Sequence, residues 1–521
     1  MKTYYKILKE ISPTLYTKIR LQLFQRSVNI EAFVKRINEI ADLIEKEHIP
    51  VNPKYKPIGM VLYPVPWAGH SLYMTLLAYL LRYRGIKVSI YFDDIVRYGL
   101  GEWTAILKDT LGRLNQNNVS VHYFSDFDIL SDIPPYDSKH GQHDALSMFI
   151  SRNKSSFVIS ESEVEGYKSD LENKYKYIYT LCKNAENMKL IVFNGVYRDT
   201  SLFTWMKDLL PDVDISFIEQ WMCSANVLST SKWDFTDFKK LYEDLPQSEQ
   251  DWIIKESERE FEKRSSGEEE YTPDIGALQK GSKDQEFHYD IVIVPNVEWD
   301  AAALNMDIVY STATEWLKDI VAYIIENTNY SVAVRQHPSE VYYFKEYGYH
   351  NDIADYLQEK YGNNPRFKMF IPKDPANTYA LIKGCKVVLP WSSDVGVDAA
   401  VLGKYVVLHT NAYYRNEPYA ISCKTREEYY CAIRRVCDNN LQSPYIREAK
   451  ITYFYHSNLS LGSLGWDPIL SYTDENFNKV VYRNVQDLVN NKTVAALAKS
   501  ICENLPISWL NYKRMRGELK L

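Results

Sequence analysis

Short apolar runs alternate with amphipathic stretches along most of the chain. The first run covers residues 58–63, and a loop, a helical stretch over 71–84, Gly85 and a second apolar run over 88–92 follow it. This alternation predicts a doubly wound α/β sheet with parallel strands. Further strand-like runs continue the pattern at 119–124, 157–159, 190–193 and 215–218.

A second series of the same kind begins at residue 291. It contains a predicted helix near 314–326. Since the chain has 521 residues, more than a single hydrophobic core usually supports, we expect two Rossmann-like domains. The predicted strands of this series are 291–294, 331–334, 369–371, 387–389 and 405–408.

The region between the two series has a different composition. Residues 256–270 form a dense run of charge, and Pro273, Gly276 and Gly281 follow it, which is typical of a linker. Apolar residues recur at helical spacing near both ends of the chain. The expected layout is a helical arm at 1–50, a first domain at 51–285 with its linker at about 240–285, a second domain at 286–475, and terminal helices at 476–521.

Charge and cysteine usage narrow the function classes. The chain carries 61 basic and 68 acidic residues, a net charge of −7 that disfavours nucleic-acid binding. Its 7 cysteines form no CxxC pair, which favours a reducing, cytoplasmic setting. Neither a signal peptide nor a membrane-spanning run is recognisable.

Both ends of the chain are basic. Residues 1–36 hold eight Lys or Arg against Glu10 and Glu31, and the C-terminal tail carries Lys513, Arg514, Arg516 and Lys520. Such helices could lie on the inner face of an anionic membrane. The alternative, which we favour for the N-terminal arm, is the solvated face of a packed helix.

The most informative motif lies where the predicted strand 331–334 ends, at Arg335-Gln-His337-Pro338. Ligands of open parallel sheets bind beyond the carboxyl ends of strands. Arg335 offers a fork of donors for phosphate, His337 a further donor, and Pro338 restricts the turn. The alternative is a His-Pro turn that only ends a strand.

A second motif follows the strand 387–389, where Ser392 and Ser393 precede a stretch of small residues. Hydroxyl groups at a helix N-terminus can complete a phosphate site, and Asp398, within that helix, could bind ribose hydroxyls. A serine in this position is equally typical of a simple helix cap. The two motifs together favour a nucleotide site more than either does alone.

The segment from about 291 to 419 resembles the bacterial capsule polysaccharide biosynthesis transferases, a group that includes Kdo transferases using CMP-Kdo. Bacterial sialyltransferases and CDP-polyol phosphotransferases are similar in their His-Pro and serine elements. The likeness rests on Pro295-Asn-Val-Glu-Trp-Asp300-Ala-Ala, Arg335-Gln-His-Pro338, Ser392-Ser393 and Asn411-Ala-Tyr-Tyr414.

This resemblance implies a GT-B fold, in which two Rossmann-like domains face a cleft, and a metal-independent glycosyltransferase. The implied reaction moves a sugar from a nucleotide-sugar donor, with a CMP-sugar such as CMP-Kdo favoured, to a growing bacterial surface or capsular polysaccharide. The implied donor-binding residues are Asn296, Asp300, Arg335, His337, Pro338, Ser392, Ser393 and Asp398.

Two departures from the family pattern leave the donor base open. Asp398 stands where the family usually has Glu, and Asn296 where it often has Gln. The same fold also serves CDP-polyol phosphotransfer and nucleotide-sugar epimerisation. A catalytically silent, glycan-binding scaffold is the alternative from another class.

The catalytic base is less visible than the donor site. His70, in Pro66-Trp-Ala-Gly-His70, resembles the Gly-His loop of several GT-B acceptor domains, and an imidazole suits proton abstraction near neutral pH. Gly69 and His70 are equally consistent with a plain strand-to-helix turn. Asp94 and Glu219, at the ends of predicted strands, are the other candidates. No cofactor and no metal site are expected, since the histidines are scattered and the Asp126-Phe-Asp128 triplet lies in an irregular region.

Overall fold

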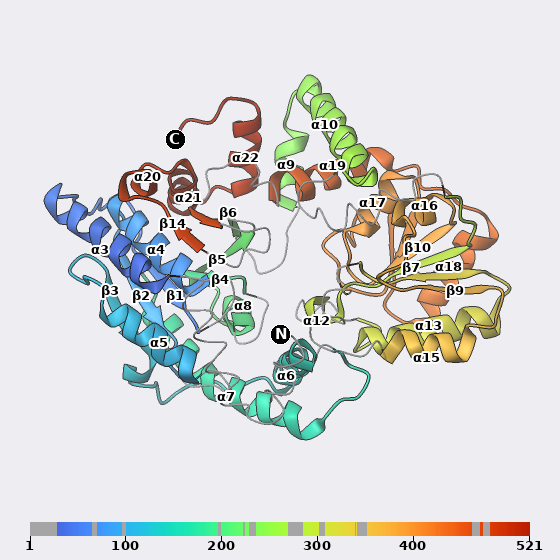
Figure 1. Ribbon diagram of the computed structural model, residues 1–521, viewed down its shortest axis with the longest axis horizontal. Helices are drawn as coiled ribbons and strands as arrows, with labels where there is room; N and C mark the ends of the chain where they lie inside the picture. Colours follow the sequence, from blue (N-terminus) through green and yellow to red (C-terminus); the bar gives the residue numbers. More distant parts are fainter. Residues whose placement is uncertain are drawn as a thin grey trace. The chain divides into compact units, whose positions relative to one another are not determined.

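In the computed structural model, the chain folds into two compact units. Figure 1 shows the helices and strands of both. The first unit contains residues 1–141, 168–233 and 459–521, and the second contains 142–167 and 234–458. The residues that the structure describes are 29–64, 70–95, 101–153, 155–195, 200–221, 224–228, 236–268, 285–301, 308–338, 340, 352–460, 469–472 and 480–521.

The first unit contains a six-stranded sheet in the order β3-β2-β1-β4-β5-β6. All pairs are parallel except β5 with β6, which form an antiparallel edge that the apolar pattern did not predict. The strands are β1 Ile58–Leu62, β2 Val88–Phe92, β3 Ser120–Tyr123, β4 Lys189–Phe193, β5 Asp214–Trp221 and β6 Ser224–Leu228.

Helices and a small hairpin accompany this sheet. Its helices are α3 Ile30–Lys46, α4 His70–Tyr83, α5 Gly101–Gly112, α8 Ser201–Leu209, α20 Val485–Val489, α21 Lys492–Glu503 and α22 Ile507–Met515, with a 3₁₀ turn at Phe124–Asp126 and an antiparallel hairpin of β13 Leu470–Tyr472 and β14 Val480–Tyr482. Helices α6 Ser138–Asn153 and α7 Glu161–Asn184 each contribute residues to both units.

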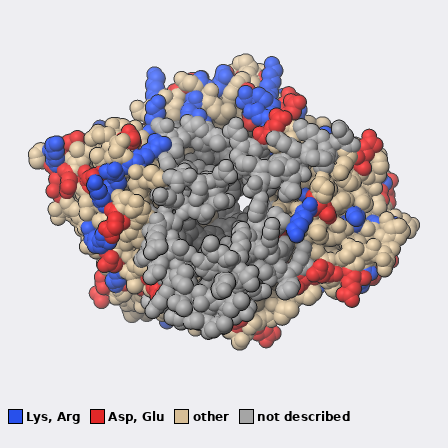
Figure 2. All heavy atoms as spheres, viewed as in Figure 1, with Lys and Arg blue, Asp and Glu red and all other residues tan. Residues whose placement is uncertain are grey.

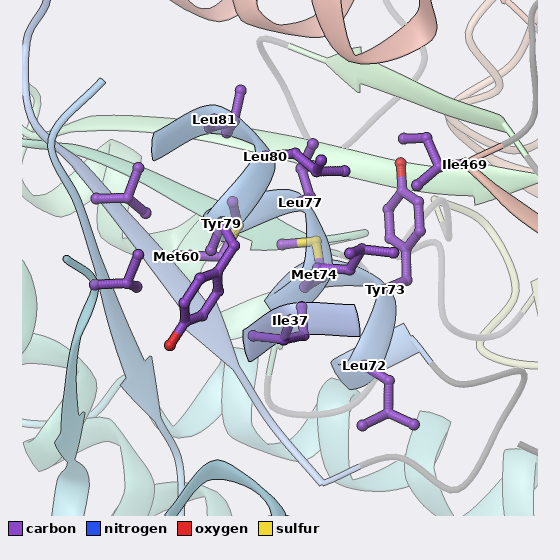
Figure 3. Close-up of a cluster of buried hydrophobic side chains, with 14 of the residues drawn as sticks. Ile37, Met60, Leu72, Tyr73, Met74, Leu77, Tyr79, Leu80, Leu81 and Ile469 are labelled. Carbon is purple, nitrogen blue, oxygen red and sulfur yellow. The ribbon is translucent and has the colours of Figure 1, made fainter. Parts of the chain in front are cut away.

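The core of the first unit joins segments from both ends of the chain. Ile37 of α3 and Leu77 of α4 are fully buried, and Ile469 belongs to the same apolar cluster (Figure 3). Lys189 Nζ, at the start of β4, donates to the Ile501 carbonyl at 3.0 Å at the end of α21. The C-terminal helices are therefore an integral layer of the first unit.

The second unit has a six-stranded, wholly parallel sheet in the order β12-β11-β10-β7-β8-β9. Its central strands are buried along their whole length, as expected of strands covered on both faces. They are β7 Ile291–Val294, β8 Val332–Arg335, β9 Phe367–Phe370, β10 Val387–Pro390, β11 Tyr405–Leu408 and β12 Ala420–Ser422.

The helices of the second unit have clear local signals. Thr312 caps α13 by accepting from Glu315 N at 3.1 Å, and the Glu315 side chain accepts from the N–H of Ser311, the residue before the cap, at 3.0 Å. Gly403, with φ +75°, ends α17 in a conformation that favours glycine. The helices are α9 Thr236–Glu243, α10 Gln247–Ser265, α12 Glu298–Ala301, α13 Ala313–Asn327, α15 Asp352–Tyr361, α16 Thr378–Lys383, α17 Val395–Val401, α18 Arg426–Asp438 and α19 Ile446–Phe454, with a π-helical turn at Tyr455–Ser460.

The predicted α/β class with two Rossmann-like sheets is confirmed. The strand predicted at 157–159 is wrong: these residues form a loop between α6 and α7, in which Val158 is 78% exposed. Part of the expected linker forms α9 and α10, which belong to the second unit. Residues 459–475, expected in the second domain, belong to the first unit.

Leu497 of α21 is fully buried in the first unit's core. We expect Leu497→Ala to lower the free energy of unfolding by about 2–5 kcal/mol, because truncation leaves a cavity. Urea denaturation followed by circular dichroism measures this change. Lys492→Ala, at an exposed position of the same helix, is the control and should change stability by less than about 0.5 kcal/mol. Equal effects of the two variants would contradict an integral α21.

Candidate donor site

The predicted nucleotide motifs follow neighbouring strands of the second unit. The sheet order places β7 between β10 and β8, so the segments after Val294, Arg335 and Pro390 leave the same edge of the sheet. The Asn296 side chain, after β7, accepts from Ser392 N at 2.9 Å, after β10. The structure therefore brings Asn296 and Ser392, 96 residues apart in sequence, into direct contact.

Arg335, the last residue of β8, is almost completely buried. Its Nη1 donates to the Ile371 carbonyl at 2.7 Å and its Nη2 to the Asp374 carbonyl at 3.3 Å. Burial lowers the pKa of the Arg335 guanidinium to about 10, so it stays charged at neutral pH. Both terminal nitrogens thus hold the loop after β9. The pair of N–H donors that the sequence suggested for phosphate binding donates to main-chain carbonyl oxygens instead.

His337 lies in the turn after β8 and is half-buried. Burial lowers the pKa of the His337 imidazole to about 4; the charges of Arg335 and Arg264 act in the same direction, and Asp394 opposes them. His337 is therefore neutral at pH 7 and offers one donor and one acceptor. Pro338 behind it is buried, as a turn-restricting residue should be.

Ser392 and Ser393 lie between β10 and α17. Ser392 Oγ is buried and has no hydrogen-bond partner among the described residues. Ser393 Oγ accepts from Val395 N at 3.3 Å, and the Ser393 carbonyl accepts from Tyr414 Oη at 2.7 Å. Ser393 thus has the local capping contact that the sequence left open, whereas the Ser392 hydroxyl is left for a ligand or water.

The side chains of Asp394 and His456 are in contact next to the two serines. The distance from His456 Nε2 to Asp394 Oδ2 is 2.8 Å, and the Tyr413 ring stacks on the imidazole at 5.8 Å between centroids. Burial opposes ionisation of Asp394, but His456, Arg264 and Tyr413 together hold its pKa below the usual range. The sequence analysis missed this pair because His456 lies 62 positions away and belongs to no motif.

Asp398 is a buried carboxylate within α17. Its Oδ2 accepts from Tyr379 Oη at 3.1 Å and lies 3.5 Å from Arg264 Nε. Arg264, on α10, lies in the charged run that was assigned to the linker. Arg264 was therefore not among the predicted site residues. The sequence signal that could have indicated it is its position three residues after the apolar Phe261, which is buried.

Two further carboxyl groups follow β7 and β8. Glu298 accepts from Ser156 Oγ and, at 3.2 Å, from Ser156 N, while Glu340 accepts from Gln336 Nε2 at 3.3 Å. Burial and the nearby Glu298 raise the pKa of Glu340 to about 8, and burial also raises the pKa of Glu298. Glu340 is thus mostly protonated at neutral pH and can act as a hydrogen-bond donor.

The first unit holds the three residues predicted as catalytic. Asp94, after β2, accepts from Lys108 Nζ at 2.5 Å and from Ser125 Oγ at 2.6 Å. Burial opposes these contacts, but they keep the pKa of Asp94 below its usual range. His70 begins α4 and Glu219 pairs with Asn226 between β5 and β6. The side chains of His70 and Glu219, and that of Asp300 in α12, lie outside the described residues.

The described part of the chain lacks two features. No group of three or more His, Cys, Asp or Glu side chains is placed to hold a metal ion there. Within the same residues, no helix has both the length and the apolar character needed to cross a bilayer. On the face visible in Figure 2, Lys and Arg lie beside Asp and Glu over the described surface.

Residues 263–442 match the family of capsule polysaccharide biosynthesis proteins. The resemblance predicted from the sequence is confirmed there, and the match contains Asn296, His337 and Ser392 as well as the unpredicted Arg264. No curated protein matches the chain.

Solved structures similar to this chain include two transferases and an epimerase. The beta Kdo 2,7 transferase of Thermosulfurimonas dismutans KpsC is 13% identical with a TM-score of 0.32, over 65% of this chain and 90% of that one. A glycosyltransferase from Rickettsia africae is 11% identical with a TM-score of 0.30, over 87% and 100%. UDP-GlcNAc 2-epimerase from Methanocaldococcus jannaschii is 13% identical with a TM-score of 0.28, over 76% and 98%.

Gly396 of α17 lies directly beneath Tyr414. A Cβ atom at this position would lie 2.2 Å from Tyr414 Oη, the group that donates to the Ser393 carbonyl. We expect Gly396→Ala to cost about 1–3 kcal/mol in denaturant unfolding, because Tyr414 is buried and has little room to move. Gly112→Ala is the control, since nothing lies within 4 Å of its Cβ position. A stability cost no larger than that of the control would contradict this packing.

The lowered pKa of His337 predicts a pH dependence of stability. The folded pKa of about 4 lies below the roughly 6.5 of an unfolded chain, so the unfolded state takes up a proton first as the pH falls. Stability is therefore fully present above about pH 6.5 and is lost progressively toward pH 4. His337→Asn should lose less stability than the wild type between pH 7.5 and 5.0 in urea titrations. Parallel losses in the two proteins would contradict a neutral His337 with a lowered pKa.

Proposed function

We propose that the protein is a glycosyltransferase of capsule polysaccharide synthesis with a GT-B architecture. It moves a sugar from a nucleotide-sugar donor, with a CMP-sugar such as CMP-Kdo favoured, to a growing bacterial surface or capsular polysaccharide. The observation that carries the proposal is the contact between Asn296 and Ser392 at adjacent strand ends, within the segment that matches the capsule family. This is the edge of a parallel sheet where nucleotides bind.

The donor site would bind the nucleotide mainly by hydrogen bonds from fixed groups. Ser392 Oγ is buried and unengaged among the described residues, and the neutral His337 imidazole carries one N–H donor. Both can donate to phosphate oxygens or to the nucleoside without a large change in structure. Preorganised donors of this kind stabilise the charge that develops on a leaving phosphate, and no metal is needed for that task.

Arg335 has a supporting role in this proposal. Its terminal nitrogens hold the carbonyls of Ile371 and Asp374, so it fixes the loop after β9 beside the site. Its positive charge also lowers the pKa of His337, as the second-largest cause after burial. Arg335 therefore shapes the site and its potential, and Asn296 fixes the main chain at Ser392.

We place the catalytic base among three residues of the first unit: His70, Asp94 and Glu219. His70 is our first choice, because its imidazole can take a proton near neutral pH and it follows the first βα loop of the acceptor domain. Asp94 is ionised and held by Lys108 and Ser125, which suits a fixed negative charge that stabilises an oxocarbenium-like centre. Glu219 is the third candidate.

We propose further that the acceptor is reached at the inner face of the plasma membrane. The C-terminal helix α22 and its tail carry four basic residues, Lys513, Arg514, Arg516 and Lys520. Lys513 lies over the partly exposed Trp509 ring at 5.3 Å. Basic and aromatic side chains in this combination are typical of helices that lie on anionic lipid.

Nucleotide binding tests the donor site. CMP, CDP, UDP and GDP are added at about a hundred times their dissociation constants, and the melting temperature is measured. The matching nucleotide should add about 2.7 kcal/mol to the stability of the folded state and raise the melting temperature. His337→Ala should abolish most of this shift, because it removes a hydrogen-bond donor of the site. His288→Ala, at an exposed position outside the site, should keep it.

Two results would refute the assignment together: no nucleotide raises the melting temperature, and His337→Ala leaves turnover intact. Mass spectrometry of the products identifies the chemistry. A transferred sugar with release of the nucleotide supports glycosyl transfer. A phosphorylated product with release of CMP would indicate polyol-phosphate transfer, and a nucleotide sugar isomeric with the donor would indicate epimerisation.

A further inference from the structure

The second sheet keeps one register across its four central strands. Val387 of β10 pairs with Ile291 of β7 and with Tyr405 of β11. Ile291 pairs in turn with Val332 of β8. Carried on beyond the ends of the strands, the same register aligns four residues in one row: Thr410, Ser392, Asn296 and His337. Both residues that the proposed donor site uses as hydrogen-bond donors therefore belong to this row.

The peptide group between Trp391 and Ser392 is held from both neighbouring strand ends. Its N–H, on Ser392, donates to Asn296 Oδ1 at 2.9 Å. Its carbonyl, on Trp391, accepts from the hydroxyl group of Thr410, which is almost completely buried. Buried main-chain groups need such partners, and beyond the last strand residue two side chains supply them. One peptide is thus fixed by the segment after β7 and by the segment after β11.

The side chain of Trp391 is fixed as well. Its ring packs against that of His409, the neighbour of Thr410 in sequence, with centroids 4.8 Å apart. It also packs against Trp316 of α13, with centroids 5.7 Å apart. Burial lowers the pKa of the His409 imidazole to about 3, so this ring is neutral among its aromatic neighbours at pH 7. The segment after β11 therefore holds Trp391 by its carbonyl and by its ring.

The Ser392 hydroxyl group differs from these fixed groups. It is buried and has no hydrogen-bond partner among the described residues. A buried hydroxyl group without a partner costs free energy, so a ligand that supplies the missing bond gains affinity. A serine side chain has a single staggered torsion between its main chain and Oγ, so the peptide position largely determines where Oγ lies.

We propose that Thr410 is a positioning residue of the donor site: its hydroxyl group holds the Trp391 carbonyl, so that Ser392 Oγ is placed to donate to the bound nucleotide. This inference rests on the proposed function and adds to it a residue that acts through the main chain. Asn296 holds the other side of the same peptide. A donor that is fixed before the ligand arrives loses less freedom on binding, which favours affinity.

A double-mutant cycle on nucleotide affinity tests this role. Titration calorimetry on the full chain identifies which of CMP, CDP, UDP and GDP the wild type binds most tightly, and that nucleotide is used throughout. Thr410→Val removes the hydroxyl group at nearly equal size. It should weaken binding by about fivefold or more, because the Trp391 carbonyl loses its donor and the peptide shifts. Thr410→Ser keeps the hydroxyl group and should bind within about twofold of the wild type.

Ser392→Ala removes the group that Thr410 is proposed to position. In the Ser392→Ala background, Thr410→Val should change the affinity by less than about twofold, because no hydroxyl group is left to position. Thr410→Ala, which removes the same hydroxyl group without adding a methyl group, is a second variant. It should follow Thr410→Val in both backgrounds, so the test does not depend on one substitution.

Thr328→Val is the matched control. Thr328 Oγ1 donates to the Ile324 carbonyl at 2.6 Å, at the C-terminal end of α13. This residue comes shortly before β8, toward the amino ends of the strands and away from the row. The change removes a similar hydrogen bond from the same unit, but nucleotide affinity should stay within about twofold of the wild type.

The outcomes separate this inference from the proposed function. A loss in Thr410→Val that Thr410→Ser restores, and that disappears in the Ser392→Ala background, supports the positioning role. Unchanged affinity in Thr410→Val overturns the role and leaves the nucleotide site standing. Equal losses in the two backgrounds also overturn it, because Thr410 then acts independently of Ser392. If the wild type binds none of the four nucleotides, the proposed donor site fails and this inference fails with it.

Discussion

The parallel pairing of β7 with β8 on one side and β10 on the other is the constraint on which the second unit depends. These strands are buried along their whole length, so their register is fixed by the apolar side chains on both faces. Three loops therefore begin at the carboxyl ends of these strands, at one edge of the sheet. The Asn296 to Ser392 hydrogen bond is possible only because this pairing closes a gap of 96 residues in sequence.

Most of the fold could be predicted from apolar runs, because continuous burial and short, regular spacing leave a strong signal in sequence. The prediction failed where three apolar residues at 157–159 form a loop: Phe157 packs against Tyr356 while Val158 is exposed, and a short run alone cannot reveal this difference. Helix α10 was hidden for the opposite reason. It has few buried residues, Ile253, Ser257 and Phe261, and the charged residues between them are of the kind found in linkers.

The sequence predicts correctly that the motifs of His337 and Ser392 directly follow strands, because each motif adjoins an apolar run. It does not predict the partners of each side chain. The role of Arg335 depends on carbonyls 36 and 39 residues away, in a loop that no motif marks. Arg264 and His456 reach the site from α10 and from the turn after α19, outside the strand ends where ligands are sought. Local sequence thus predicts the strands and turns that position the site. Tertiary packing determines which hydrogen-bond donors of the site already bind other groups of the protein.

Charge pairing around the site has a consequence for proton transfer. The buried Asp398 is paired with Arg264, and Asp394 lies 2.8 Å from His456, so both carboxylates already have a partner on the protein. His337 in the same region has its pKa held at about 4 by burial and by two guanidinium charges. A phosphate beside His337 would oppose those charges and raise this pKa, since an opposite charge favours the protonated imidazole. If the proposed donor site holds a phosphate at this point, its binding would thus shift the pKa of His337 toward the range in which an imidazole shares a proton with its partner.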